Sequence, residues 1–406
     1  MRGRYLSVGS GYPRTSERRL ESSALFCCVY YQYIPFMNDR SNRESNAELL
    51  RIICILFILL HHFCVHAFYP ELLQTDMNGQ SWDSHLLLFF HAFFFIGVNC
   101  FILISGWFSI KPKWRSFFNL YLIYAFYNLL HPFRHVAKAL MQGEGFVLPY
   151  PVKNIIARTL LPFSHGHLWF MDCYLGLFLM APLLNTAVNY MNRQQHLLVL
   201  ILLTVANVYF GDFWSMNLIN ASEGYSLANF VYLYLIGSYL HRYISLDTIN
   251  RNRWRWFMAY CIFGVLWGIC TMLSAYFNNG IGAILVQHWH AFAYNNPIIL
   301  LTSVSFFLFM MSWHFKSRFI NYIAASMLGV YMFQEKVIRY GLLVPFAHQF
   351  SPIVQLSLLL AVTVAFFIMA VGVDQIRILL TKPVWFIYNH YIDRWLSNLS
   401  SKFQSK

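Results

Sequence analysis

The apolar segment from Glu48 to His66 carries side chains that could do chemistry. Arg51 and His62 are eleven positions apart, and an α-helix places such residues about 20° apart in azimuth and roughly 16 Å apart along its axis. They therefore share one helix face, which His66 extends by one turn, whereas His61 points about 100° away. A neutral imidazole accepts a proton near physiological pH, and a guanidinium holds an anion through a planar fork of donors.

Ionisable side chains at membrane depth are costly and usually face a bundle interior or a watery cavity, so each is a functional candidate. Structural explanations stay open for each residue alone. Arg51 could extend to the cytoplasmic headgroups, and His62 could be a hydrogen-bonded core histidine. His62 and His66 have the i, i+4 spacing of metal ligands, but two histidines without an associated carboxylate are weak grounds for zinc. We expect no metal.

The composition excludes an ordinary soluble enzyme. Of the 406 residues 58% are apolar and 11% are charged, against about 45–50% and 25% in soluble domains. We expect an all-α polytopic membrane protein, a bundle of about ten transmembrane helices. The ten apolar windows are 47–68, 86–109, 116–133, 167–190, 196–213, 225–243, 255–276, 292–314, 318–338 and 352–380.

The basic residues predict the orientation. The net charge is +13, but the Lys and Arg residues lie in short segments between apolar windows, as in cytoplasmic loops, so we expect no nucleic acid partner. With both termini cytoplasmic, four short inner loops hold Lys111, Lys113, Arg115, Arg193, Arg242, Arg251, Arg253, Arg255, Lys316 and Arg318. Three of the opposite loops, 69–85, 214–224 and 277–291, hold no Lys or Arg, whereas the two others hold Arg134, Lys138, Lys153, Arg158, Lys336 and Arg339. Both termini are therefore predicted to be cytoplasmic, in a multi-pass protein of the plasma membrane.

The two ends of the chain differ from the apolar region 47–381. Residues 1–46 are polar and basic and are predicted to be disordered, and translation could begin at Met37 as well as at Met1. Residues 382–406 repeat an apolar residue every fourth position, which predicts an amphipathic cytoplasmic helix on the membrane interface. The stripe is Ile387, Tyr391, Trp395, Leu399 and Phe403.

Several motifs, taken in order, resemble the acyltransferase-3 family of integral membrane O-acyltransferases over about residues 43–380. The opening match is an acidic residue, Glu48, three positions before Arg51, with His62 eleven positions after the arginine. The other matching stretches are Phe101-Ile-Leu-Ile-Ser-Gly-Trp-Phe108, the basic loop Lys111-Pro-Lys-Trp-Arg115, His167-Leu-Trp-Phe170 running into Ala181-Pro-Leu-Leu184, Leu235-Ile-Gly-Ser-Tyr-Leu240 and Leu328-Gly-Val-Tyr-Met332.

The resemblance implies transfer of an acyl group, usually acetyl, from a cytoplasmic thioester to a hydroxyl of a surface or secreted glycan. His62 would then be the general base, and Arg51 and Glu48, on the same helix, would be further catalytic residues. Acyl-coenzyme A is strongly anionic, so Arg115, Lys113 and Lys111 would hold its phosphates. The same three charges would also mark a cytoplasmic loop in any membrane protein.

The acceptor would be a saccharide or lipid-linked glycan, contacted by His167, Trp169 and Glu335. The chain departs from the family at 334–335, where Gln334 and Glu335 stand in place of a frequent histidine. Glu335 could instead pair with Lys336 and Arg339, and Trp169 could be an interfacial anchor.

Two further patterns have simpler structural explanations. Asp374 and Arg377 lie one helical turn apart and are predicted to pair with each other. Ser105-Gly106 could offer a nucleophile, but this dipeptide in a membrane helix more often permits close helix packing.

A transporter or flippase for lipid-linked saccharides is the alternative function, and a polysaccharide polymerase is a third. Such proteins also have many helices, interior charges and aromatic residues. The shared helix face of Arg51 and His62 favours the acyltransferase, because a flippase needs no base at mid-membrane.

Overall fold

The computed structural model describes residues 44–73, 80–161, 168–213, 222–276, 290, 292–337 and 349–392, and every secondary-structure element in these ranges is helical. The helices of the first half are α2 (Ser45–Phe63) with η1 (Cys64–Phe68) and η2 (Pro70–Leu73), α3 (Trp82–Phe90), α4 (Ala92–Phe95), α5 (Gly97–Phe108), α6 (Trp114–Met141), α7 (Val152–Leu160) and α8 (Trp169–Tyr190). The second half has α9 (Arg193–Thr204), η3 (Val205–Phe213), η4 (Ser222–Gly224), α10 (Leu227–Tyr243), α11 (Leu246–Arg251), α12 (Arg253–Tyr276), α14 (Pro297–Met311), α15 (Arg318–Ala324), α16 (Met327–Val337), α18 (Pro352–Leu380), α19 (Lys382–Ile387) and η5 (Tyr388–Ile392).

Helices occupy all ten predicted apolar windows, but fewer have the length and hydropathy of a membrane span. In the described part of the chain five do so, and a sixth is the bent pair α3 with α4–α5. The five are Ser45–Phe68, Trp169–Tyr190, Arg193–Asp212, Arg253–Tyr276 and Pro352–Leu380. At 17 and 15 residues, α10 and α14 are shorter than the roughly 20 residues that a straight crossing needs.

The outer helices leave apolar side chains uncovered. In α18 the most apolar stretch has a mean hydropathy of 2.6, and only 22% of it is buried inside the protein. Such a surface is unfavourable in water and suits lipid chains. The all-helical fold and these helices together make the chain a membrane protein.

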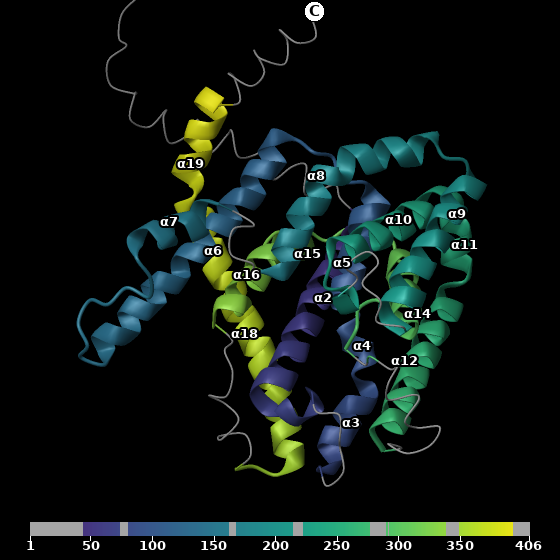
Figure 1. Cartoon of the computed structure of the whole chain (residues 1–406), viewed down its shortest axis with the longest axis horizontal. Coiled ribbons are helices and arrows are strands. Elements are labelled where there is room, and N and C mark those ends of the chain that lie inside the picture. Colours follow the sequence, from purple (N-terminus) through teal and green to yellow (C-terminus); the bar gives the residue numbers. More distant parts are fainter. Residues whose placement is uncertain are drawn as a thin grey trace, which may run out of the picture.

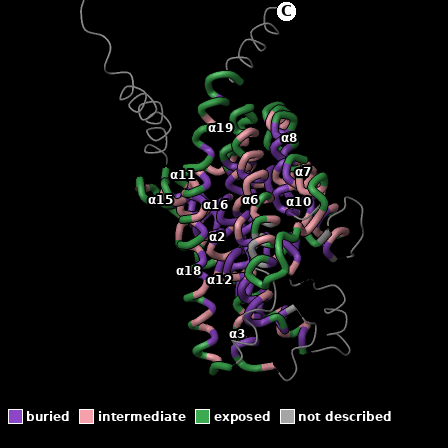
Figure 2. Tube along the Cα trace, turned by 90° about the vertical axis from the view of Figure 1, so that its left-hand side faces the viewer, coloured by how far each residue is buried: buried purple, intermediate pink, exposed green. Residues whose placement is uncertain are grey.

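The central helix is α2, which contacts α4, α5, α14, α15, α16 and α18. Buried residues gather along this middle region, while α19 and the outer face of α18 are exposed (Figures 1 and 2). The helix starts on a fixed support. Ser45 donates its backbone N–H to the Phe315 carbonyl at 2.9 Å and its hydroxyl to Asn321 Oδ1 at 2.8 Å. The position of Arg51 and His62 is therefore set from the first turn.

Glycines let α5 and α10 cross at close range. A Cβ at Gly106 would stand 2.1 Å from the Tyr234 carbonyl oxygen, and one at Gly237 would stand 2.4 Å from the Leu103 oxygen. The neighbouring Ser105 donates its hydroxyl within its own helix, to the Phe101 carbonyl at 3.0 Å. The packing interpretation of Ser105-Gly106 is confirmed.

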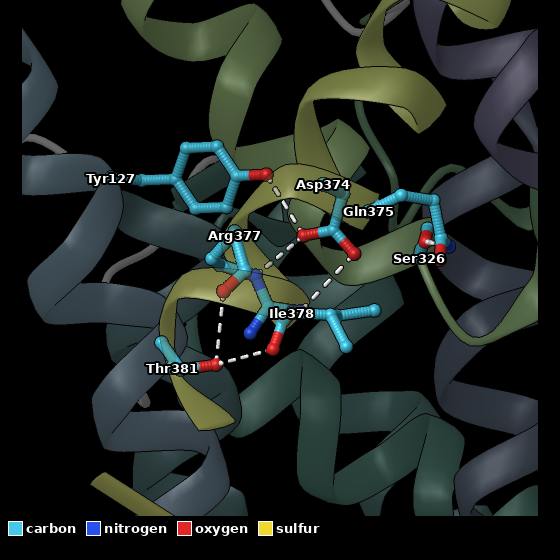
Figure 3. A network of polar contacts seen from close by, with 7 residues as sticks. All are labelled: Tyr127, Ser326, Asp374, Gln375, Arg377, Ile378 and Thr381. Carbon is cyan, nitrogen blue, oxygen red and sulfur yellow. Dashed lines mark hydrogen bonds and ion pairs between the residues drawn. The ribbon is translucent and has the colours of Figure 1, made fainter. Parts of the chain in front are cut away.

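Asp374 and Arg377 pair inside the bundle, as predicted. Arg377 Nε donates to Asp374 Oδ1 at 2.6 Å and Nη2 donates to Oδ2 at 3.1 Å. Tyr127 of α6 donates its hydroxyl to the same Oδ1 at 2.8 Å (Figure 3). The carboxylate rests directly on Gly329 of α16, where a Cβ would meet Oδ1 at 1.8 Å. This buried pair joins α6, α16 and α18.

The ends of the chain are only partly described. Residues 1–43 lie outside the described ranges, as do Trp395, Leu399 and Phe403 of the predicted interfacial stripe. Within the described part, α19 and η5 form a short helical tail on which Ile387 and Tyr391 are exposed. Trp385 of this tail lies under the Arg115 guanidinium, 5.4 Å from the ring centroid.

Breaking the buried ion pair should destabilise the bundle. Asp374→Ala leaves the Arg377 guanidinium buried without its carboxylate, a loss of about 3–5 kcal/mol. Tyr127→Phe removes one hydrogen bond from a carboxylate that keeps its arginine, a loss of about 1 kcal/mol. Thermal unfolding of the detergent-solubilised protein measures both. Equal melting temperatures for Asp374→Ala and wild type would contradict the structural role of the pair.

Candidate active site

A cavity of about 230 Å³ lies at the far end of α2 from Ser45. We call it the histidine cavity. It is lined by His61, His62, Val65, His66, Trp169, Tyr225, Phe292, Tyr294, Gln334 and Glu335. Since a water molecule takes about 30 Å³ of liquid, the space suits a small acyl group and an attacking hydroxyl. A whole nucleotide or glycan would extend out of it.

His62 and Glu335 lie next to each other in this cavity. The Nδ1 atom of His62 lies 3.9 Å from Glu335 Oε1, which is beyond hydrogen-bond range but close for a charge interaction. A carboxylate on the Nδ1 side of a histidine stabilises its imidazolium form. The sequence prediction that His62 and His66 share a face is confirmed, since both line the cavity and their ring centroids are 5.6 Å apart.

An aromatic wall closes another side of the cavity. The Trp169 ring lies 4.6 Å from Tyr225 and 5.6 Å from Tyr294, and those two tyrosines are 4.8 Å apart, all between ring centroids. Trp169 was predicted from the sequence, whereas Tyr225, Phe292 and Tyr294 were not. They come from two other segments, so no local spacing pointed to them.

The segment that carries Phe292 and Tyr294 is fixed by polar contacts. Asn99 Nδ2 donates to the Tyr294 carbonyl at 2.9 Å, and the Tyr294 N–H donates to the Glu223 carbonyl at 2.8 Å. His290 pairs with Asp212 at 3.2 Å, and this hydrogen bond raises the pKa of His290 above its ordinary value. The aromatic wall is therefore held in place before any ligand arrives.

His61 corrects the helical-wheel prediction. Its ring also lines the cavity, although it lies on a different face of α2 from His62. The ring centroids of the two histidines are 5.3 Å apart. Behind the lining, His61 contacts His91 and Phe95, while Glu335 lines the cavity beside His62. The cavity thus extends around the end of α2 and is lined by both His61 and His62.

Gln334 is a site residue whose role the sequence left uncertain. It is 1% exposed and lines the cavity beside His62. Within the described residues, neither its Oε1 nor its Nε2 has a hydrogen-bond partner. A buried amide without partners costs about 1–3 kcal/mol per missing bond, so a ligand in the cavity would gain both a donor and an acceptor here.

Arg51 and Glu48 lie elsewhere on α2 and pair with each other, with Nη1 and Oε1 at 2.5 Å. Neither lines the cavity. Lys111, Lys113 and Arg115 are exposed between α5 and α6. Gly97 of α5 packs against the Cys54 carbonyl of α2. Glu48 and Arg51 lie in the first turns of α2, whereas the cavity lies at its last turn.

The structure brings together three of the predicted site residues, His62, Trp169 and Glu335. His167 lies outside the described residues. Among those described, no group of three or more His, Cys, Asp or Glu side chains is arranged to hold a metal ion.

An all-helical membrane bundle with a histidine–carboxylate cavity at the end of its central helix defines a membrane protein with the groups of an acid–base catalyst. The chain belongs to the acyltransferase-3 family, whose model, described as an acyltransferase domain, matches residues 45–373. No curated protein and no solved structure matches the chain at a significant level. Family membership supports acyltransferase activity, with an acyl donor and an acceptor as substrates.

Replacing the unpartnered amide of Gln334 should lower the acyltransferase activity without lowering the stability of the protein. Gln334→Leu removes two unsatisfied groups at similar volume, so the melting temperature should stay equal or rise slightly while acyl transfer falls. Asn99→Leu is the matched control, because the Asn99 amide donates to Tyr294 and Ser303, and its loss should lower the melting temperature. A Gln334→Leu protein as unstable as Asn99→Leu would show that the amide serves the fold.

Proposed function

We propose that the protein transfers an acetyl group from acetyl-coenzyme A to a hydroxyl of a cell-surface or secreted glycan, with His62 as general base. The position of His62 in the cavity, with Nδ1 3.9 Å from Glu335 Oε1, is the observation that carries the proposal. Neither group needs a metal for this chemistry.

The reaction needs one proton to be moved twice. His62 takes the hydroxyl proton as the alcohol oxygen bonds to the thioester carbonyl carbon. When the carbon–sulfur bond breaks, the electron pair leaves with sulfur, and His62 returns the proton to it. Glu335 stabilises the imidazolium between these steps. Gln334 supplies a donor and an acceptor that can hold the sugar hydroxyls or the acyl group.

The donor would lie along α2. Arg51 is roughly 16 Å from His62 along the helix axis, and α2 is an unbroken helix between them. A long, flexible thioester can reach the cavity while Arg51, Lys111, Lys113 and Arg115 hold its phosphates near the cytoplasmic face. In this arrangement Glu48 orients Arg51 through their ion pair.

The acceptor would bind against the aromatic wall. Flat aromatic surfaces with a few placed polar groups are typical of small-molecule pockets, and Trp169, Tyr225 and Tyr294 offer such a surface to a sugar ring. We further propose ten spans, with both termini in the cytoplasm of a plasma membrane protein, so that the wall belongs to the outer half of the bundle.

The product can be tested in the host. Deleting the gene should remove one acetyl mass from a surface or secreted glycan, wild-type gene should restore it, and His62→Ala should not, because loss of a base lowers rates by about 10²–10⁴-fold. Mass spectrometry of the glycans, with immunoblots of the membrane protein, measures this. An unchanged acetylation pattern with altered glycan export would favour a flippase instead.

Donor binding can be tested at Arg51. Arg51→Lys keeps the charge but loses the planar fork, so KM for acetyl-coenzyme A should rise roughly tenfold, as expected for one lost charge-assisted hydrogen bond. Arg193→Lys is the control, since Arg193 is an exposed residue on α9. An unchanged KM in Arg51→Lys would remove this residue from donor binding.

A further inference from the structure

A second histidine of the histidine cavity, His61, is hydrogen-bonded to a third histidine, His91. His61 Nδ1 and His91 Nε2 are 2.8 Å apart, and both residues are buried. His91 does not line the cavity, whereas His61 does. The ring of His61 is thus fixed through one nitrogen, and its other nitrogen, Nε2, is left for the cavity.

The hydrogen bond between the rings allows two neutral arrangements. Either His61 Nδ1 carries the proton and donates it, or His91 Nε2 does. In the first arrangement His91 Nδ1 would also be protonated. That atom is buried and has no hydrogen-bond partner within the described residues, so the first arrangement leaves a buried N–H unsatisfied, which proteins rarely tolerate.

The second arrangement leaves only a bare lone pair at His91 Nδ1. Trp267 packs against His91 with ring centroids 6.2 Å apart, and its buried Nε1–H is also without a partner. A bare nitrogen at His91 Nδ1 adds no unsatisfied donor to this buried region, whereas a second N–H would. His91 Nε2–H therefore donates to His61 Nδ1, and His61 must carry its own proton on Nε2.

We propose that His61 is the oxyanion-stabilising residue of the acyl transfer and that His91 is the positioning residue that fixes its tautomer. The inference rests on the proposed function. When the hydroxyl oxygen bonds to the thioester carbon, negative charge develops on the carbonyl oxygen, and His61 Nε2–H donates a hydrogen bond to it without giving up its proton. The hydroxyl proton goes to His62 and then to the departing sulfur, so His61 ends the cycle unchanged.

This division of roles follows from what each ring faces. His62 has a carboxylate, Glu335, on its Nδ1 side and can become positively charged. His61 has a neutral imidazole on its Nδ1 side and is fixed as a donor. Preorganised donors aimed at developing charge are a large source of rate enhancement, and two imidazoles with different partners supply a base and a donor in one cavity.

The tautomer can be measured without any substrate. The full-length protein with ¹⁵N-labelled histidines, in lipid bilayers, should show His61 and His91 both protonated at Nε2 and bare at Nδ1 by solid-state NMR. Signals lost in His61→Gln and in His91→Gln assign the two rings, and His390→Gln, at an exposed residue of η5, should remove neither. A proton on Nδ1 of either ring would overturn the inference.

The catalytic role is tested with labelled acetyl-coenzyme A and membranes that contain the host's own glycans. His61→Leu should lower kcat by about 10²–10³-fold, with little change in KM for the donor and an unaltered shape of the pH profile. His61→Gln should recover part of the loss, because its amide is a donor but cannot be a base. His91→Leu should lower kcat less than His61→Leu.

The outcomes separate the two proposals. Wild-type protein without acetyl transfer would contradict the proposed function and leave the tautomer measurement standing. Active wild type, inactive His62→Ala and normal kcat in both His61 variants would overturn the role of His61 alone. If His61→Leu fails to accumulate in membranes, His61→Gln and His91→Leu still decide, since kcat per molecule equal to wild type in both contradicts the inference.

Discussion

Every polar side chain within the apolar bundle depends on a partner supplied by the protein, because lipid chains offer none. Most of the polar side chains described above find their partner in another side chain or in a backbone carbonyl of the protein. Arg377 pairs with Asp374, and Ser45 bonds to Phe315 just before α15 and to Asn321 within it. The Ser45 contacts fix the start of α2 against α15, and the ion pair joins α6, α16 and α18. The amide of Gln334, which has no partner among the described residues, lies in the cavity, where a substrate would supply one. The same constraint thus builds the scaffold and reveals the cavity.

Sequence periodicity was sufficient for features that lie within one helix. The shared face of His62 and His66, the Asp374–Arg377 pair and the close packing at Gly106 all follow from positions less than two turns apart. The aromatic wall could not be predicted in this way, because Tyr225 and Tyr294 reach Trp169 only through tertiary packing. His61 was misplaced for a related reason: the helical angle was right, but the breadth of the cavity around the helix end is set by α4 and α16. The role of Gln334 depends on missing partners, which only a structure reveals.

The short helix α16 links the scaffold to the chemistry. Gly329 receives the Asp374 carboxylate on its bare Cα, and six residues later Glu335 faces His62. Six residues of α-helix span about 9 Å, so the Asp374–Arg377 ion pair and the Glu335 carboxylate beside His62 are close along one rigid element. A side chain at position 329 would push α16 away from α18 and change the distance from Glu335 to His62. The fold therefore fixes the orientation of the carboxylate from outside the cavity.

His91 is also the residue at which the chain bends between α3 and α4–α5, by 43°. On either side of the bend, Phe89 and Phe93 sit on Gly268 and Gly264 of α12, so the angle is held by packing. The ring at this bend is the one that supports His61. The angle between α3 and α4–α5 and the orientation of the His61 ring therefore depend on the same residue, so a change in that angle would also change the donor that His61 offers to the cavity.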